Sequence, residues 1–322
     1  MRGRSLSLLG LVVSALCVAG VVFWAVNQPA PRLPSDARHL LYVLGAALLY
    51  ALNTGVRGER WHRLLVQDGA RPHRSDSYAL TVVGYTGNNI LPARAGDAVR
   101  VVLMAPRADS SRRTVVGTLI AERLLDLAVI LLLFVVVGYA VLGEVGAGEI
   151  EVLAAITAAG LLAAGLGVVA LRRNERLMGL VRPMLSSTLG LLGRGGVGLV
   201  AMTLLIWLLE TFVWMTVGAA AGLDMSLVQG LYLVALASIF SLIPSGPAYA
   251  GTQDVAAVIG IKAIGGSSSL ASGYLILLRF VLQVPITLAG LLLLALRYGG
   301  IGKLRRARLE EGTATTDARS PT

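Results

Sequence analysis

Six apolar stretches, each long enough to cross a lipid bilayer as a helix, constrain this chain more than any other feature. A membrane-spanning helix needs about 20 mostly apolar residues to cross roughly 30 Å of hydrocarbon. The stretches cover residues 6–26, 38–56, 114–142, 151–171, 198–221 and 270–296. Because 56% of the 322 residues are apolar and only 14% are charged, a water-soluble domain is excluded. The sequence therefore predicts an all-α, polytopic membrane helix bundle.

Two pairs of shorter apolar segments are each interrupted by a polar break. The first pair covers residues 77–91 and 98–105, and the second covers residues 227–243 and 248–264. The segments of the first pair are too short to cross a bilayer by themselves, and a second hairpin lets the chain leave Asp224 outside and end inside. Both breaks contain helix-breaking residues, namely Gly87, Pro92, Gly96, Pro244, Gly246 and Gly251. We therefore predict two re-entrant helical hairpins in addition to six full crossings.

Basic residues cluster at the ends of the apolar stretches and account for the net charge of +10. The clusters lie near the N-terminus and in residues 57–74, 107–113, 172–194 and 297–308. Basic loops usually face the cytoplasm, so we interpret this charge as a topology signal and not as a nucleic-acid-binding surface. The pattern predicts a protein of the cytoplasmic (inner) membrane with both termini in the cytoplasm. Residues 57–75 and 172–196 are interpreted as basic amphipathic surface helices.

The two halves of the chain repeat one order of elements from opposite sides of the membrane. Each half reads helix, helix, hairpin, helix, with the first hairpin entering from the cytoplasm and the second from outside. This order indicates an inverted repeat, an architecture that many transporters use to build a site near the membrane midplane. The alternative is that the short pairs cross completely, which gives eight to ten full crossings. Residues 1–300 form one membrane domain, and residues 301–322 are expected to be a basic and then disordered cytoplasmic tail.

Polar side chains around the first break are candidates for binding an anionic head group. Irregular backbone at membrane depth is tolerated where a cavity or other protein groups satisfy its donors and acceptors. A helix N-terminus attracts anions, and guanidinium groups match phosphate in geometry. We therefore predict that Asn88, Asn89, Arg94 and Arg100 bind the phosphate, and that Asp97 orients the arginines. Alternatively, both arginines pair with Asp97 or extend to lipid head groups.

Charged residues within the long stretches are further candidates, because charge inside a membrane is costly and usually faces a cavity or a partner. Glu122, Arg123 and Asp126 share one helical face, where they form either a cavity wall or an ion-paired strut to the first hairpin through Arg94 or Asp97. Three further charged residues complete the predicted substrate-binding set, namely Glu210, Asp254 and Arg279. Glu210 is interpreted either as a proton carrier or as the ion-pair partner of Arg279.

Four motifs resemble one known family, the flippase-like transmembrane domain of lysylphosphatidylglycerol synthases. They are residues 53–61, residues 122–126, Ile243-Pro244 and the block Asn88-x-x-x-Pro92-x-Arg94-x-Gly96-Asp97-x-x-Arg100. The resemblance covers roughly residues 5–300 and implies a bacterial or archaeal inner-membrane protein that moves a lipid across the bilayer. The soluble synthase domain of that family is expected to be absent. The second break departs from the family pattern, because residues 247–254 lack its glycine-rich run and Asp254 stands where a glutamate is usual.

Three functions are compatible with these observations. The first is a non-enzymatic translocase that moves a phospholipid or a lipid-linked head group between leaflets. The second is a scaffold for a separately encoded lipid synthase or glycosyltransferase. The third is a membrane enzyme acting on lipid phosphates, although the sequence shows no HExxH pattern and no paired histidines among His39, His62 and His73. No cofactor or metal is expected, and Cys17, the single cysteine, allows no disulfide within the chain.

Overall fold

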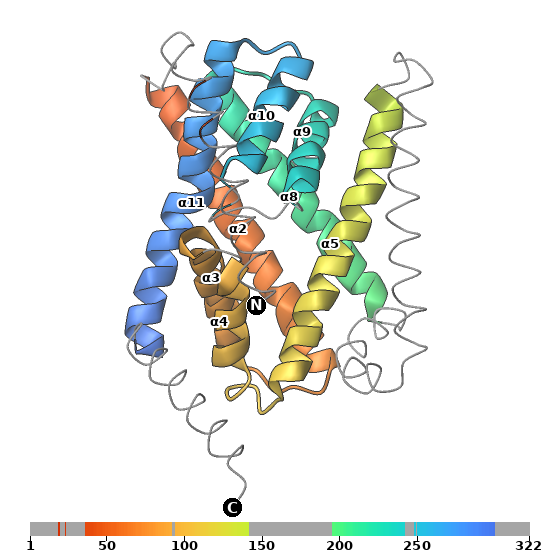
Figure 1. The fold of residues 1–322 in the computed structure, drawn as a ribbon, viewed down its shortest axis with the longest axis vertical. Coiled ribbons are helices and arrows are strands. Elements are labelled where there is room, and N and C mark those ends of the chain that lie inside the picture. Colours follow the sequence, from red (N-terminus) through yellow and green to blue (C-terminus); the bar gives the residue numbers. More distant parts are fainter. Residues whose placement is uncertain are drawn as a thin grey trace, which may run out of the picture.

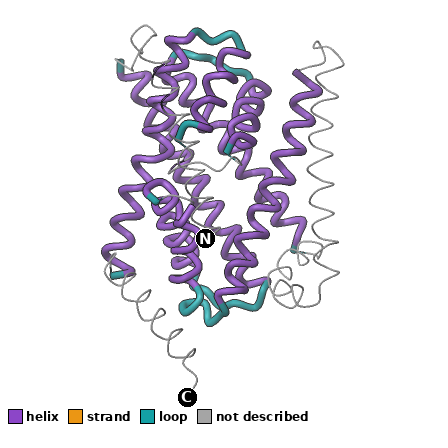
Figure 2. Tube along the Cα trace, in the orientation of Figure 1, coloured by secondary structure: helices purple, strands orange, loops and turns teal. Residues whose placement is uncertain are grey.

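The described part of the protein is entirely helical. A computed structural model describes residues 36–91, 94–141, 195–241 and 250–299, together with Ala19, Phe23 and Ala248. Its helices are α2 (Ala37–Gln67), α3 (Arg74–Ile90), α4 (Ala95–Met104), α5 (Arg112–Val141), α8 (Gly196–Ala221), α9 (Leu227–Phe240), α10 (Thr252–Ala263) and α11 (Ser268–Tyr298). Figure 2 shows helices joined by loops throughout these residues, without a strand. The all-α prediction is therefore confirmed for the described residues.

Among the described helices, α2, α8 and α11 have the length and the apolar composition needed to cross a membrane. They correspond to the predicted stretches 38–56, 198–221 and 270–296, and α5 corresponds to the predicted stretch 114–142. The protein is thus an integral membrane protein. Four predicted segments lie wholly or mostly outside the described residues, namely 6–26 (apart from Ala19 and Phe23), 151–171, the surface helix 172–196 and the tail 301–322.

Helix α2 extends well beyond its predicted end at residue 56, which corrects the prediction for residues 57–75. This segment was expected to lie on the membrane surface, but α2 continues as one helix to Gln67. Arg60 is only 1% exposed, and the side chain of Arg57 is 11% exposed. The prediction failed because these two arginines contact acidic side chains of neighbouring helices, so their charge is compensated inside the protein and not by water.

Both predicted breaks interrupt helices. Helix α3 ends at Ile90 and α4 begins at Ala95, while α9 ends at Phe240 and α10 begins at Thr252. Arg94 and Ala248 adopt left-handed backbone conformations, with φ angles of 55° and 56°. Such angles are unfavourable for residues other than glycine and are found where the surrounding structure holds the chain in place. Pro92, Pro244 and Gly246 lie outside the described residues.

Glycines allow α3 and α4 to pack backbone to backbone. A Cβ atom added to Gly96 would collide with the carbonyl oxygen of Gly84 and with the backbone nitrogen of Asn88. A Cβ atom on Gly87 would lie 2.5 Å from the Cα atom of Gly96. The two ends of this hairpin also meet, because the backbone N–H of Arg71 donates to the carbonyl oxygen of Ala108 over 2.8 Å. Gly87 and Gly96 are therefore required by close packing.

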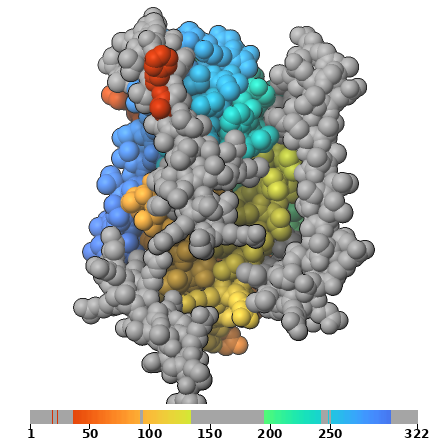
Figure 3. Space-filling model, in the orientation of Figure 1, coloured from red at the N-terminus to blue at the C-terminus, as the bar shows by residue number. Residues whose placement is uncertain are grey.

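The two helix pairs occupy opposite ends of the molecule and lie between two long helices. Figure 1 shows α3 and α4 in the lower half and α9 and α10 in the upper half. Helix α11 contacts α3 and α10, while α5 contacts α9 and α4. In the space-filling view, α11 (blue) and α5 (yellow) form separate parts of the same face (Figure 3). Each long helix thus contacts both helix pairs.

The packing of the described helices has a two-fold pattern. Helices α2 and α8 run antiparallel at the centre, where Arg60 contacts Thr203 and Asn53 contacts Glu210. We pair α2 with α8, α3 with α9, α4 with α10 and α5 with α11. Exchanging the two members of every pair leaves the α2–α8 contact unchanged and converts each other substantial helix–helix contact into another observed contact. For example, the contact of α11 with α3 becomes the contact of α5 with α9.

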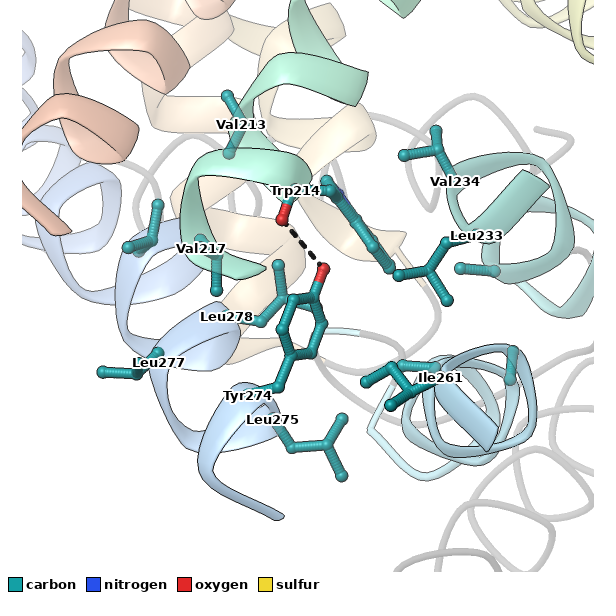
Figure 4. Close-up of a cluster of buried hydrophobic side chains, with 14 of the residues drawn as sticks. Val213, Trp214, Val217, Leu233, Val234, Ile261, Tyr274, Leu275, Leu277 and Leu278 are labelled. Carbon is teal, nitrogen blue, oxygen red and sulfur yellow. Dashed lines mark hydrogen bonds between the residues drawn. The ribbon is translucent and has the colours of Figure 1, made fainter. Parts of the chain in front are cut away.

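A large apolar cluster surrounds the second helix pair. Trp214, Leu233, Ile261 and Tyr274 bring together side chains of α8, α9, α10 and α11. Figure 4 shows the Tyr274 hydroxyl pointing to the backbone of α8, where it donates to the carbonyl oxygen of Trp214 over 3.2 Å. This bond satisfies a polar group at the centre of an apolar region.

The Tyr274→Phe variant should lower the free energy of unfolding by about 0.5–1.5 kcal/mol, the usual contribution of one hydrogen bond. The ring would remain packed while its hydroxyl is removed. Unfolding of the purified protein in detergent micelles would measure this effect. Tyr42→Phe is the matched control, because the Tyr42 hydroxyl accepts from Arg38 at an exposed position. Equal losses in both variants would contradict the assigned role of the Tyr274 bond.

Candidate functional site

A cavity of about 310 Å³ lies between the two breaks, and charged and polar side chains line it together with apolar ones. Helices α2, α3, α5, α8, α9, α10 and α11 all contribute to its wall. Arg94 lines it from the first break, and Ser241 and Ala248 line it from the second. Six of the residues predicted to bind substrate line it, namely Asn88, Asn89, Arg94, Arg123, Asp126 and Glu210. The cavity therefore brings together residues from both halves of the chain.

Glu210 of α8 is held by side chains of α2 and of its own helix. Its carboxylate accepts from Asn53 over 2.7 Å and from Arg57 over 3.3 Å. The indole N–H of Trp214 donates to the other carboxylate oxygen over 3.3 Å. Sequence analysis proposed Arg279 as the ion-pair partner of Glu210, whereas the structure places Arg57 in that position. Arg57 also lies over the ring of Trp207, with its guanidinium carbon 5.5 Å from the ring centroid.

Arg60 forms a buried, two-pronged ion pair with Asp126. Its two terminal nitrogens donate to the two carboxylate oxygens of Asp126 over 2.7 and 3.1 Å. One of them also donates to the hydroxyl of Thr203 over 3.0 Å. A second carboxylate, that of Glu122, lies 3.7 Å away. Arg60 therefore connects α2 with both α5 and α8.

Arg100 is buried behind the cavity and does not belong to its described lining. It donates to Glu122 over 2.9 Å and lies 3.7 Å from Asp97. Its guanidinium carbon is 3.9 Å from the ring centroid of Trp61, an arrangement that stabilises a buried cation. Arg100 was predicted to contact phosphate together with Arg94. Because it is only 2% exposed and already engaged, the structure places it as a link between α4, α5 and α2.

Asp97 connects the first helix pair to α5. Its carboxylate accepts from Arg123 over 3.1 Å and from the Asn88 amide over 3.4 Å. Sequence analysis considered an ion-paired strut through Arg94 or Asp97, and the contact between Arg123 and Asp97 has that geometry. Arg123 also lines the cavity, so one side chain belongs both to the strut and to the cavity wall.

Arg94 links the first break to the second half of the chain. Its guanidinium donates over 2.8 Å to the carbonyl oxygen of Ser241, which caps the C-terminus of α9. A cation is favourable there because the C-terminal end of a helix carries partial negative charge. Nearby, the Asn89 amide donates to the Thr287 hydroxyl of α11 over 3.0 Å. Both contacts cross from the first half of the chain to the second.

Asp254 and Arg279 shape the second break. The Asp254 carboxylate accepts from the backbone N–H of Gly251 over 2.8 Å and from Arg279 over 2.7 Å. Arg279 also donates to the carbonyl oxygen of Ala248 over 2.7 Å. These two residues were predicted to bind substrate, but they lie outside the described lining of the cavity and hold the start of α10 in place. Ala248 reaches a left-handed conformation here without the family's glycine.

The polar face of α2 was not predicted, although the sequence carries a signal for it. Asn53, Arg57 and Arg60 follow a spacing of four and then three residues, which places them on one helical face. The prediction ended the apolar stretch at residue 56 and assigned Arg57 and Arg60 to a separate surface helix, so the three side chains were not placed on one helix. Tyr50, Tyr85, Gln253 and Gln283 also line the cavity. They come from four different helices, so no local pattern in the sequence connects them.

Comparison with known proteins places this site in a family context. The family model described as "Lysylphosphatidylglycerol synthase TM region" matches residues 7–290. A curated relative, "Glycosyltransferase AglD" of Haloferax volcanii, is 25% identical over 328 aligned residues, which cover 87% of this chain and 52% of that protein. The chain thus spans about half the length of that relative. No solved structure matches the chain.

Proposed function

Because this chain belongs to the lysylphosphatidylglycerol synthase TM region family, we propose that it is a lipid translocase. It moves the head group of a phospholipid or a lipid-linked compound between the leaflets of the cytoplasmic membrane and catalyses no reaction of its own. The observation that carries this proposal is the cavity of about 310 Å³ between the two helix breaks, whose wall contains charged and amide side chains. A polar head group needs such an enclosure, because hydrocarbon offers it no hydrogen-bond partners.

The proposed arrangement in the membrane is an inverted repeat with two re-entrant hairpins and cytoplasmic termini. Helices α3 and α4 contain 17 and 10 residues, each fewer than the roughly 20 residues that a crossing requires. The contact between Arg71 and Ala108 joins the two ends of this hairpin, which supports entry and exit on one side. The two-fold packing pattern supports the relation between the halves. Transporters with this architecture expose a central site alternately to each side.

The guanidinium groups of the cavity suit a phosphate that enters from the membrane. Arg57, Arg94 and Arg123 line the cavity and can present paired N–H donors to phosphate oxygens. Each of these arginines already contacts a protein partner, so phosphate binding replaces existing contacts. The acyl chains remain in the bilayer while the head group passes through the cavity.

A second candidate is an accessory role beside a glycosyltransferase. The relative from Haloferax volcanii bears the name glycosyltransferase, and this chain aligns with 52% of its length. Exposed arginines such as Arg63 and Arg74 could serve as a docking surface for a separate enzyme. This role predicts a stable complex and no leaflet exchange by the isolated protein.

Reconstitution into liposomes tests the proposal directly. Purified protein should accelerate the exchange of lipids labelled on an acyl chain, measured by quenching the label in the outer leaflet. Arg94→Ala should slow exchange by about tenfold or more, since a hydrogen bond to a charged group contributes about 1.5–3 kcal/mol. Arg63→Ala, which removes an exposed arginine outside the cavity, should leave the rate unchanged.

The other outcomes distinguish the competing functions. Chemical turnover of the lipid without exchange would favour a membrane enzyme. Absence of both activities, together with a glycosyltransferase that co-purifies, would favour the accessory role. Equal rates in vesicles with and without the protein would remove the translocase proposal.

A further inference from the structure

We propose that two ion pairs at equivalent positions, Asp97–Arg123 and Asp254–Arg279, are the gates of the cavity, one for each face of the membrane. Breaking the first gate releases α3 and α4 from α5, and breaking the second releases α9 and α10 from α11. This inference rests on the proposed function and adds the device by which the head group enters and leaves the cavity.

The two gates occupy the same places in the two halves of the chain. Asp97 is the third residue of α4, and Asp254 is the third residue of α10. Their partners, Arg123 and Arg279, are each the twelfth residue of the next long helix, α5 or α11. The aspartate accepts from the arginine over 3.1 Å in the first gate and over 2.7 Å in the second. Each gate therefore ties the second helix of a broken pair to the long helix that follows it.

The local structure around each aspartate is repeated as well. The residues that precede α4 and α10, Arg94 and Gly251, have positive φ angles of 55° and 88°. Each aspartate also accepts from its own break, because Asp97 contacts the Asn88 amide and Asp254 contacts the backbone N–H of Gly251. A contact that recurs together with its backbone in both halves is expected to serve the same purpose on each side.

The neighbouring ion pair of Arg100 with Glu122 is not repeated. Arg100 is the sixth residue of α4 and Glu122 the eleventh of α5, and the residues at these places in α10 and α11 are Ala257 and Leu278. That ion pair is also buried, whereas the four side chains of the gates are between 14% and 37% exposed. Breaking a buried ion pair leaves a charge without compensation, but water or a ligand can replace a partner in an accessible one. The gates thus have the exchangeable contacts that opening requires.

Each gate lies beside the cavity. Arg123 lines it directly, and Arg279 donates to the carbonyl oxygen of Ala248, which lines it at the second break. Figure 1 shows α3 and α4 in the lower half of the molecule and α9 and α10 in the upper half. In the proposed arrangement each broken helix pair therefore separates the cavity from one face of the membrane. Release of one pair opens the cavity to that face while the other gate stays closed.

A phosphate group has the chemistry needed to open the first gate. It accepts paired N–H donors from a guanidinium, as a carboxylate does. A phosphate that reaches Arg123 in the cavity replaces Asp97, and the contact that holds α4 against α5 is lost. Asp97 keeps a nearby cation, because Arg100 of the same helix lies 3.7 Å away. Binding of the head group is thereby coupled to opening.

Labelling a cysteine inside the cavity from one membrane face at a time tests the two gates. The reporter is Ser238→Cys, which lines the cavity on α9, in the full-length chain with its single cysteine replaced as Cys17→Ser. Right-side-out and inside-out membrane vesicles, treated with a membrane-impermeant maleimide, give the labelling rate from each face. Asp97→Asn should raise the rate about threefold or more from the face nearer to α3 and α4, as the loss of one accessible ion pair allows. Asp254→Asn should do so from the opposite face.

Glu59→Gln is the matched control, because it breaks an ion pair with Arg63 outside the cavity and should leave both rates unchanged. Arg123→Gln and Arg279→Gln break the same gates from the long helices, so they keep the test decisive if an aspartate variant fails to fold. Asp97→Glu and Asp254→Glu keep the negative charge and should raise the rates less than the asparagine variants do.

Two results would overturn the gates, namely unchanged labelling in all the aspartate and arginine variants or increases from the same face for both gates. Labelling requires no lipid movement, so the expected increases without leaflet exchange would contradict only the translocase function. Leaflet exchange by the wild-type protein, with unchanged labelling in the variants, would contradict only the gates.

Discussion

Replacing Arg60 with methionine should lower the free energy of unfolding by about 3–5 kcal/mol, the cost of breaking a buried ion pair from one side. The variant leaves Asp126 buried with its nearest remaining guanidinium, that of Arg57, 3.9 Å away. Glu122 keeps its bond to Arg100, and Thr203 keeps its bond to the carbonyl oxygen of Leu199. The expected loss of stability is therefore assigned to the Asp126 carboxylate, which loses both hydrogen bonds from Arg60 and remains buried.

The double variant Arg60→Met/Asp126→Leu should recover most of that stability. Removing both charges eliminates the desolvation cost that a single substitution exposes, and an apolar pair of similar size is often neutral or stabilising. Equilibrium unfolding in detergent micelles measures both variants. Arg63→Met is the control on the same helix, because its ion pair with Glu59 is exposed and should contribute less than about 1 kcal/mol. A double variant less stable than Arg60→Met would contradict this explanation. The Arg60–Asp126 pair would then stabilise the fold through other contacts in addition to compensating the two charges.

Alanine at Gly96 should destabilise the first helix pair by about 3 kcal/mol or more, the upper end of the range for overpacking. The new methyl group would meet the backbone of α3 at Gly84 and Asn88. Backbone atoms cannot move aside as a flexible side chain can, so α4 would have to shift away from α3. That shift would disturb the contacts of Asp97 with Arg123 and of Arg100 with Glu122.

Gly55→Ala provides the matched control for this prediction. Gly55 lies within α2, and no atom lies within 4 Å of the position where its Cβ would be. Alanine there should stabilise the helix by up to about 1 kcal/mol, since glycine is the poorer helix former. Thermal unfolding in detergent, followed by gel filtration, would compare the two variants. Similar melting temperatures for Gly96→Ala and the wild type would show that α3 and α4 are not in direct backbone contact.

The fold was predictable to the extent that it depends on local properties. The helices α5, α8 and α11 begin and end within two residues of the predicted stretches, and both helix pairs break where glycine and proline occur. Hydropathy and helix-breaking residues act over a few neighbouring positions, so the sequence displays them directly. The predicted end of α2 at residue 56 was wrong, because the surroundings of Arg57 and Arg60 are formed by α5 and α8, which lie far away in the sequence.

The candidate site was predictable as a set of residues and only partly as a set of contacts. Asn88 and Arg94 were selected as hydrogen-bond donors at the first break, and Asp126 and Glu210 were selected as charged residues within apolar stretches. All four line the cavity. The predicted ion-pair partner of Glu210, Arg279, was wrong. Arg100, which was predicted to contact phosphate, lies behind the cavity. Nothing in the amino-acid order indicates which carboxylate a given arginine will contact.

By itself the sequence determined that this protein is a helical membrane protein, where most of its described helices lie and where two of them are interrupted. The tertiary structure decided which charges neutralise one another and which remain around the cavity. Arg60 contacts an acid 66 positions away in the chain, and Arg57 contacts one 153 positions away. A charge in a medium that screens poorly must be compensated by whatever group packing brings near it. Partners so distant in the chain are set by how the helices pack.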